Sequence, residues 1–198
     1  ISFVLYNDQK KPGAAAGAGT EAPALETSGN PAETPETTEG TSSAEELTEE
    51  TITSPVAGTV VPTDQVSDET FASELLGTTV AVEPSDGKIT APCSGEVMNI
   101  FDTGHAVCLT TESGAELLIH VGIDTVKLDG KGFTKKVSDG DKIHAGDVLI
   151  EADLDQIRAA GYPATTMVIL TNADQFSAVE KAAPGETGRD QPILKLKK

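Results

Sequence analysis

The sequence predicts an all-β fold: an antiparallel β-sandwich or barrel with a few short helices, preceded by a disordered acidic linker. Three observations support this prediction. Short β-branched runs recur between Gly, Pro, Asp and Asn residues from Thr51 onward, few windows show a helical period, and the composition changes near residue 50. Several short strands separated by turn signals are typical of antiparallel sandwiches and barrels.

The first 50 residues differ in composition from the rest of the chain. They contain 10 acidic and 2 basic residues, whereas residues 51–198 contain 22 and 12. Between Pro12 and Glu50 there are nine Glu, no Lys or Arg and no aromatic residue. Such a stretch buries too little apolar surface to offset its conformational entropy. We therefore expect residues 12–50 to be a disordered linker that lets a domain reach its neighbours.

Residues 1–11, ISFVLYNDQKK, combine an apolar start with Lys10 and Lys11. They fit either an irregular tail or the last turn of a membrane helix that ends in cytoplasmic lysines. The residues alone favour neither interpretation.

Residues 51–198 are expected to form one domain, because about 150 residues can bury a core without disulfides. Helical periodicity is strongest at 68–76 and 153–160, about two turns each. The expected strands lie in nine runs: TVVPT, TVAVEP, GKITAP, GEVMNI, HAVCLTT, ELLIHVGI, DVLIEAD, TTMVILTN and PILKLKK.

Charge and cysteine content exclude several classes of function. The formal net charge of the 198 residues is −18, and nucleic-acid binding requires a basic surface. Anionic membrane surfaces are disfavoured for the same reason. No run approaches the roughly 20 apolar residues that span a bilayer. Cys93 and Cys108 show no metal-ligand or disulfide spacing, which is typical of a reducing compartment.

The chain has three histidines, His105, His120 and His144. Residues 105–120 read as strand, turn, strand. A two- or four-residue loop makes opposing residue numbers sum to 225, which pairs His105 with His120 on one face, Cβ atoms about 4.5–5.5 Å apart. A three-residue loop makes the sum 226 and separates the rings. We expect His144 on a polar surface, and Cys108 on the face away from His105.

A histidine pair could bind metal, act as a nucleophile or simply pack, and packing is the commonest role of a histidine in a strand. Neighbouring residues favour a functional site. Gly122 allows close backbone approach, so a carbonyl there could hold one ring nitrogen of His120 and leave the other free. Thr103 could add a hydroxyl and Asp124 a carboxylate, which is more polarity on one surface than a core requires.

Two stretches carry a resemblance to a known family: FDTGHA at 101–106 and LIHVGIDTVKLDGKGF at 118–133. They resemble the glucose-type IIA domain of the bacterial sugar phosphotransferase system, and the similarity extends from residue 54 to residue 197. The resemblance implies an antiparallel β-sandwich. It also implies that His120 accepts a phosphoryl group and that His105 is its supporting partner. Gly104 stands where better-known relatives carry Asn.

The resemblance gives roles to three further residues. Thr103 matches the hydroxyl hydrogen-bonded within the pair, Gly122 the residue whose carbonyl orients the active imidazole, and Asp124 the nearby carboxylate. No cofactor is implied. Candidates for an exposed apolar ring that would contact partners are Phe71, Leu75, Phe101 and Val126.

The implied partners are the histidine phosphocarrier protein HPr, a IIB domain and a membrane IIC domain. HPr would donate the phosphoryl group and a cysteine of IIB would receive it. Residues 1–11 would then be the end of the membrane domain, and residues 51–198 would lie in the cytoplasm, tethered at the inner face of the membrane.

Two alternatives stay open. A zinc hydrolase could use the H-x-x-x-D spacing of His120 and Asp124, but it needs further ligands; His105 and His120 could also bind zinc weakly. A biotinyl or lipoyl carrier module is suggested by residues 91–97 and 140–149. Such modules need a lysine at a hairpin tip, and the IEADLD segment that follows has none.

Overall fold

The computed structural model describes residues 49–198, and the expectations for residues 1–11 and for the linker up to residue 48 lie outside this part. The described strands are β1 Glu49–Thr53, β2 Gly58–Val61, β3 Thr78–Pro84, β4 Lys88–Thr90, β5 Gly95–Ile100, β6 Ala106–Thr111, β7 Glu116–Val121, β8 Phe133–Lys135, β9 Lys142–Ile143, β10 Val148–Ala152, β11 Thr166–Leu170, β12 Ala178–Lys181, β13 Gly185–Thr187 and β14 Pro192–Lys197. The helices are η1 Thr63–Gln65, α1 Glu69–Ala72, η2 Thr125–Leu128, α2 Leu154–Ala159 and η3 Ala173–Gln175.

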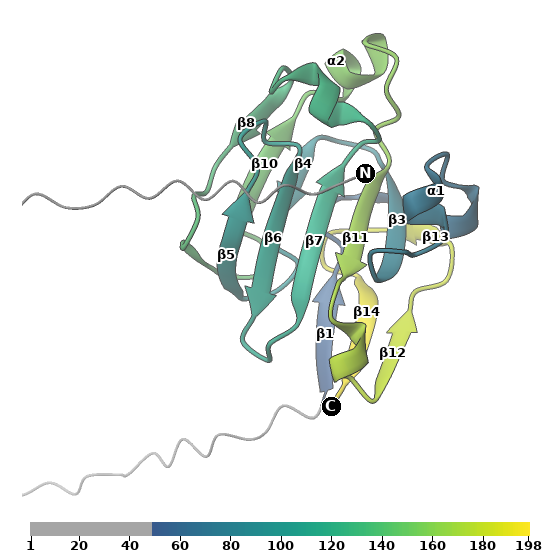
Figure 1. Ribbon diagram of the computed structural model, residues 1–198, viewed down its shortest axis with the longest axis vertical. Helices are drawn as coiled ribbons and strands as arrows, with labels where there is room; N and C mark the ends of the chain where they lie inside the picture. Colours follow the sequence, from purple (N-terminus) through teal and green to yellow (C-terminus); the bar gives the residue numbers. More distant parts are fainter. Residues whose placement is uncertain (1–48) are drawn as a thin grey trace, which may run out of the picture. The chain divides into compact units, whose positions relative to one another are not determined.

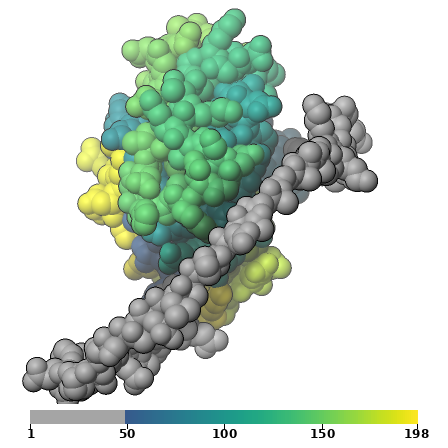
Figure 2. All heavy atoms as spheres, turned by 90° about the vertical axis from the view of Figure 1, so that its left-hand side faces the viewer, coloured from purple at the N-terminus to yellow at the C-terminus, as the bar shows by residue number. Residues whose placement is uncertain are grey.

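The strands form one large and two small antiparallel sheets. The large sheet has the order β13-β2-β3-β11-β7-β6-β5-β9, and the small sheets have the orders β1-β14-β12 and β4-β10-β8. Strands β5, β6, β7 and β11 lie side by side, with α1 beside β3 (Figure 1). Seen from the side of β5, the surface is formed largely by the green segment that carries β8 to β10 (Figure 2). The all-β prediction is confirmed.

The main core lies against one face of the large sheet, which we call the inner face. Strand alternation sends Val107, Leu109, Leu117, Ile119 and Val121 to this face, and all five are at most 1% exposed. They share one cluster with apolar residues of both small sheets. The two small sheets therefore cover the inner face.

The opposite face of the large sheet, the outer face, carries a second and smaller core. Met167 and Ile169 of β11 pack there with Phe71 and Ile123. Phe71 is brought to the sheet by α1, whose first turn is capped by Asp68: the carboxylate accepts bonds from the amides of Thr70 and Phe71. Such an Asp cap satisfies amides that lack helical partners. His120 pairs with Met167 across the strands, so it lies at the margin of this cluster.

Most predicted elements are present, and the structure adds strands that were not predicted, β1 among them. All nine predicted runs contain strands, and both helical windows contain helices that begin after Asp68 and Asp153. Strand β1 pairs with β14 along its whole length and begins at Glu49, two residues before the residue 51 at which the domain was expected to begin. No helix in residues 49–198 is long and apolar enough to span a membrane.

Candidate functional site

The register of the β6–β7 hairpin differs from the prediction. Ala106, not His105, stands opposite His120, and the residue numbers of each pair sum to 226. The amide of Thr111 donates to the Ala115 carbonyl at 2.9 Å, which extends the same register by one pair beyond the strand ends and leaves a turn of three residues, 112–114. The predicted sum of 225 was therefore wrong. His105 nevertheless reaches His120, because it precedes β6 and so does not follow the alternation of the strand. Its carbonyl accepts a bond from Val121 N at 2.8 Å.

The two imidazole rings are in edge contact, and each also neighbours a phenylalanine ring. The centroids of His105 and His120 are 4.9 Å apart, and the rings are inclined by 76°. Phe71 lies 5.1 Å from the His120 ring, and Phe101 lies 5.3 Å from the His105 ring. Each imidazole therefore contacts both a phenylalanine ring and the other imidazole, which limits how far either ring can turn.

Each ring is also held by a hydrogen bond at Nδ1. In His120, Nδ1 lies 2.8 Å from the carbonyl oxygen of Gly122; because a carbonyl only accepts, Nδ1 carries the proton and Nε2 has a free lone pair. In His105, Nδ1 lies 2.5 Å from the Thr103 hydroxyl. When this hydroxyl donates, Nε2 of His105 carries a proton and is a hydrogen-bond donor.

Burial keeps both imidazoles neutral near pH 7. His105 is 5% exposed, and its burial, together with the nearby His120, lowers the pKa of His105 to about 4. Burial also lowers the pKa of His120, although the Gly122 bond and the carboxylates of Asp68 and Asp124 act in the opposite direction. Desolvation disfavours the charged form of a base. The lone pair of His120 Nε2 is therefore available at physiological pH.

The predicted carboxylate lies beside the histidines, and the structure adds a second one. Asp124 has φ +63° and forms an ion pair of 2.7 Å with the exposed Lys127. Asp68 was missed by sequence reasoning. Its field acts on His120 even though its oxygen caps α1. The signal was present in the sequence, because Asp68 opens the predicted helix that carries Phe71, but helix capping alone does not indicate a place near a histidine.

The predicted partner-binding ring is partly wrong. Phe71 is only 8% exposed, because its ring packs between the outer face of the sheet and His120, and it is therefore a core residue. Phe101 is half-buried against His105. Leu75 and Val126 are 78% and 50% exposed, as expected for residues free to contact another protein. The 43% exposed Leu76 extends this surface.

The sequence also raised expectations for Gly104, His144 and Cys108. Gly104 has φ +68°, a conformation that Gly adopts without strain, and a Cβ there would lie 3.1 Å from the Phe133 Cβ, so Gly suits this turn. His144 is an exposed surface residue, as predicted. Cys108 pairs with Leu118 and therefore lies on the same face as His120, which contradicts the predicted placement. Burial raises the pKa of its thiol, so it is a poor nucleophile.

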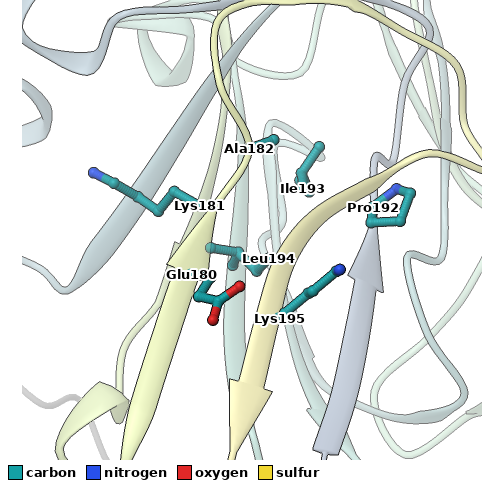
Figure 3. Close-up of a pocket in the computed structure, with 7 residues that line it drawn as sticks. All are labelled: Glu180, Lys181, Ala182, Pro192, Ile193, Leu194 and Lys195. Atoms are coloured by element: carbon teal, nitrogen blue, oxygen red, sulfur yellow. The ribbon is translucent and has the colours of Figure 1, made fainter.

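Four hollows on the surface of residues 49–198 are lined by residues other than the two histidines. One, of about 230 Å³, is lined by residues of β12, β14 and the chain beside them, including Lys181 and Lys195 (Figure 3). Three others are lined by other loops and strands, and none of the four includes His105 or His120. Within residues 49–198, no group of three or more His, Cys, Asp or Glu side chains is placed to hold a metal ion. A zinc hydrolase requires at least three protein ligands.

Comparison with known proteins assigns the chain to a family. The model for the phosphoenolpyruvate-dependent sugar phosphotransferase system, EIIA 1, matches residues 50–176. The chain belongs to this family. It is a phosphoryl-transfer component of a sugar phosphotransferase system, and the zinc hydrolase and carrier-module alternatives find no support.

Relatives of two kinds are similar to the chain. The glucose-specific EIIA component of Halalkalibacterium halodurans is 44% identical over 146 residues, which is 74% of this chain and 84% of that protein. The β-glucoside-specific EIIBCA component of Dickeya chrysanthemi is 45% identical over 148 residues, but this covers 75% of the chain and only 24% of the relative. The chain thus spans about a quarter of such multidomain relatives. Among solved structures, glucose permease IIA from Mycoplasma capricolum matches with TM-score 0.68 and 31% identity over 74% of this chain and 95% of that one.

Proposed function

We propose that His120 is the residue that carries the phosphoryl group and that His105 assists it. The observation that carries this proposal is the free Nε2 of a neutral His120, held beside a second imidazole on the outer face of the sheet. In phosphoryl transfer the protein contributes mainly positioning and charge stabilisation. The fixed ring of His120 provides the first, and the Nε2–H of His105 provides the second.

The reaction would proceed as two in-line displacements. Nε2 of His120 attacks phosphorus of a phosphorylated donor, a P–N bond forms to His120, and the bond between phosphorus and the donor breaks. Nδ1 keeps its proton and its bond to Gly122 throughout. In the second displacement a thiolate attacks phosphorus, a P–S bond forms, and His120 leaves as the neutral imidazole. Thr103 keeps His105 in the tautomer that donates to a phosphoryl oxygen.

The donor in this proposal is the phosphocarrier protein HPr, and the acceptor is a cysteine of a IIB domain. Both are proteins, so an open face with exposed apolar residues suits them better than a pocket. Leu75 and Val126 provide apolar area, and Asp68 and Asp124 provide negative charge beside His120. Charges at the rim of a contact steer a partner of opposite sign. A basic residue of HPr would complement these two carboxylates.

The tethering of the domain is also a proposal. Relatives named EIICBA and EIIBCA combine three components in one polypeptide, among them the glucose-specific EIICBA component of Streptococcus pneumoniae, 43% identical over 166 residues. By analogy, residues 49–198 would work in the cytoplasm at the inner face of the membrane, joined through residues 12–48 to IIB and IIC domains. Residues 1–11 would then end the preceding membrane segment.

Incubation with phosphoenolpyruvate, enzyme I and HPr tests the assignment. We expect one acid-labile, base-stable phosphoryl group per chain, lost in His120→Gln and retained in His105→Gln. His144→Gln is the matched control, because it removes an exposed histidine of this domain, and it should be phosphorylated like the wild type. Phosphorylation of His120→Gln at the wild-type level would overturn the proposal.

A further inference from the structure

We propose that Thr125 is a positioning residue for phosphoryl transfer, which selects the reactive tautomer of His120 through the backbone of residues 121–123. Thr125 is fully buried and belongs to η2, directly after the loop that follows β7. It is too deep to touch a phosphoryl group or a partner protein. Its effect on the reaction must therefore pass through the residues that it contacts.

The hydroxyl of Thr125 fixes the first of two consecutive peptide groups. Thr125 Oγ1 donates to the carbonyl oxygen of Val121 at 2.6 Å. The amide of the same peptide group, Gly122 N, donates to the carbonyl of Thr165 at 3.1 Å. Both ends of the peptide group that joins Val121 to Gly122 are therefore held, and its plane cannot rotate without breaking a buried hydrogen bond.

The second peptide group carries the oxygen that holds His120. The carbonyl of Gly122 accepts from His120 Nδ1 at 2.8 Å, and the amide on the other side, Ile123 N, donates to the carbonyl of Pro163 at 3.0 Å. The direction of the Gly122 carbonyl is set by the φ and ψ angles that link the two groups. A change in the first group thus turns the acceptor away from the imidazole.

Packing shows that Thr125 and Gly122 fit each other closely. Gly122 has φ +76°, and a Cβ added there would lie 2.4 Å from the Thr125 methyl group and 2.8 Å from the Pro163 carbonyl. No other residue type fits at position 122 without moving these neighbours. Thr125 therefore acts on this loop twice: its hydroxyl binds the Val121 carbonyl, and its methyl group fills the space that a side chain at 122 would need.

The same loop also links the two histidines. Val121, whose carbonyl accepts from Thr125, donates its own amide to the carbonyl of His105 at 2.8 Å. Loss of the Thr125 hydroxyl would therefore loosen the carbonyl that holds Nδ1 of His120 and the strand end that aligns His105. If the Gly122 bond weakens, His120 populates the tautomer with the proton on Nε2, which has no lone pair there and cannot attack phosphorus.

The inference rests on the proposed role of His120, so the test needs one readout that is independent of transfer. Nitrogen NMR of the imidazole reports the tautomer in the unphosphorylated protein. We expect Nδ1–H in the wild type and a mixture of tautomers in Thr125→Val. We also expect kcat for acceptance from HPr to fall at least about tenfold, with little change in the KM for HPr, because geometry at the reacting centre is altered and the docking surface is not.

Two variants complete the design. Thr125→Ser keeps the hydroxyl and should restore the wild-type tautomer and most of kcat. Thr90→Val removes a buried hydroxyl that binds the Pro55 carbonyl at 3.1 Å in another sheet, and it should leave both readouts unchanged. If Thr125→Val does not fold, Thr125→Ala, which also lacks the hydroxyl but buries no extra methyl group, takes its place.

The outcomes separate the inference from the proposed function. A wild-type tautomer and rate in Thr125→Val would overturn the inference and leave the role of His120 intact, as would a Thr90→Val variant that reproduces the change. A tautomer shift in Thr125→Val with no phosphorylation of His120 in the wild type would overturn the proposed function, and it would keep Thr125 as the residue that orients this ring.

Discussion

The β6–β7 hairpin has a turn at one end and the two histidines at the other. At both ends, side-chain hydrogen bonds hold backbone that is not part of a strand, but only the second end carries a group that could react. At the tip, the buried amide of Asn172 donates to the Gly114 carbonyl and accepts from the Glu116 amide, both at 2.9 Å. The Thr111 hydroxyl bonds to the Glu50 carboxylate and accepts from the Ala115 amide. Both side chains use their polar atoms to hold the backbone or another side chain, so the tip is stabilised but offers no reactive group.

The end that carries the histidines is held in the same way, by side chains and carbonyls, but Nε2 of His120 is left without a partner among residues 49–198. Thr103 holds His105, and Gly122 and Thr125 hold the loop beside His120. Among residues 49–198, no hydrogen bond reaches Nε2 of His120. The comparison shows that rigidity alone does not distinguish a functional end from a structural one. The distinguishing feature is a fixed imidazole whose second nitrogen takes part in no hydrogen bond within residues 49–198.

The largest effect is expected from His105→Gln on onward transfer. The variant should still accept phosphate on His120, because the lone pair of Nε2 does not depend on His105. Transfer to the IIB cysteine should fall by about 10²-fold or more, the usual cost of removing one preorganised donor to a developing charge. Single-turnover transfer from the phosphorylated domain measures this rate. Equal rates in the variant and the wild type would exclude a supporting role for His105.

The second effect is a dependence of the free energy of unfolding on pH, caused by His105. The pKa of His105 lies at about 4 in the folded protein, below its ordinary value of about 6.5. As the pH falls through 6.5, the unfolded chain takes up a proton that the folded protein does not, so the free energy of unfolding decreases until about pH 4. The total loss is roughly 3 kcal/mol.

Denaturant titrations at several pH values measure this loss. In His105→Gln the decrease between pH 6.5 and pH 4 should be smaller than in the wild type by about that amount. A parallel decrease in both proteins would mean that His105 is not the group responsible.

The third effect is confined to the tip. Asn172→Ala leaves the Gly114 carbonyl and the Glu116 amide without a partner, and we expect a loss of about 1–3 kcal/mol in the free energy of unfolding. The rate of phosphoryl acceptance should not change while the protein is folded. Urea denaturation and the HPr assay measure the two quantities. A slower acceptance rate would show that the two ends are coupled, contrary to the comparison.

The smallest effect is expected from Asp124→Asn. The carboxylate is about half exposed and is paired with Lys127, so its field is partly screened. We expect acceptance from HPr to slow by a few-fold at low salt, and the difference to vanish at high salt. Glu112→Gln, an exposed acid at the hairpin tip, is the matched control. A salt-independent effect would indicate a role in chemistry instead of docking.

Sequence patterns predicted the secondary structure well because it depends on local signals. The β-branched runs and the capping residues Asp68 and Asp153 act over a few residues. Strands β8, β9, β12 and β13 were not predicted because they have two to four residues and depend on their sheet partners. Strand β1 was not predicted either, because it forms by pairing with β14, far away in the chain, and its first residues have the acidic composition of the preceding segment.

The sequence predicted which residues of the proposed site lie together, but not the hairpin register beside them. His105, His120, Thr103 and Gly122 come together as the family resemblance implies, with the predicted bonds. The hairpin register could not be predicted, because the polar residues 111–114 are compatible with turns of two, three or four residues. The burial of Phe71 and the field of Asp68 depend on how α1 folds over the outer face, which no local pattern encodes.

The central claim is that Nε2 of His120 is the one reactive atom of the pair. Nitrogen and phosphorus NMR of the protein phosphorylated by HPr identifies the modified atom directly. We predict a single phosphohistidine, at Nε2 of His120, with Nδ1 still protonated and bonded to Gly122. Phosphate at Nδ1 of His120, or on His105, would contradict the account.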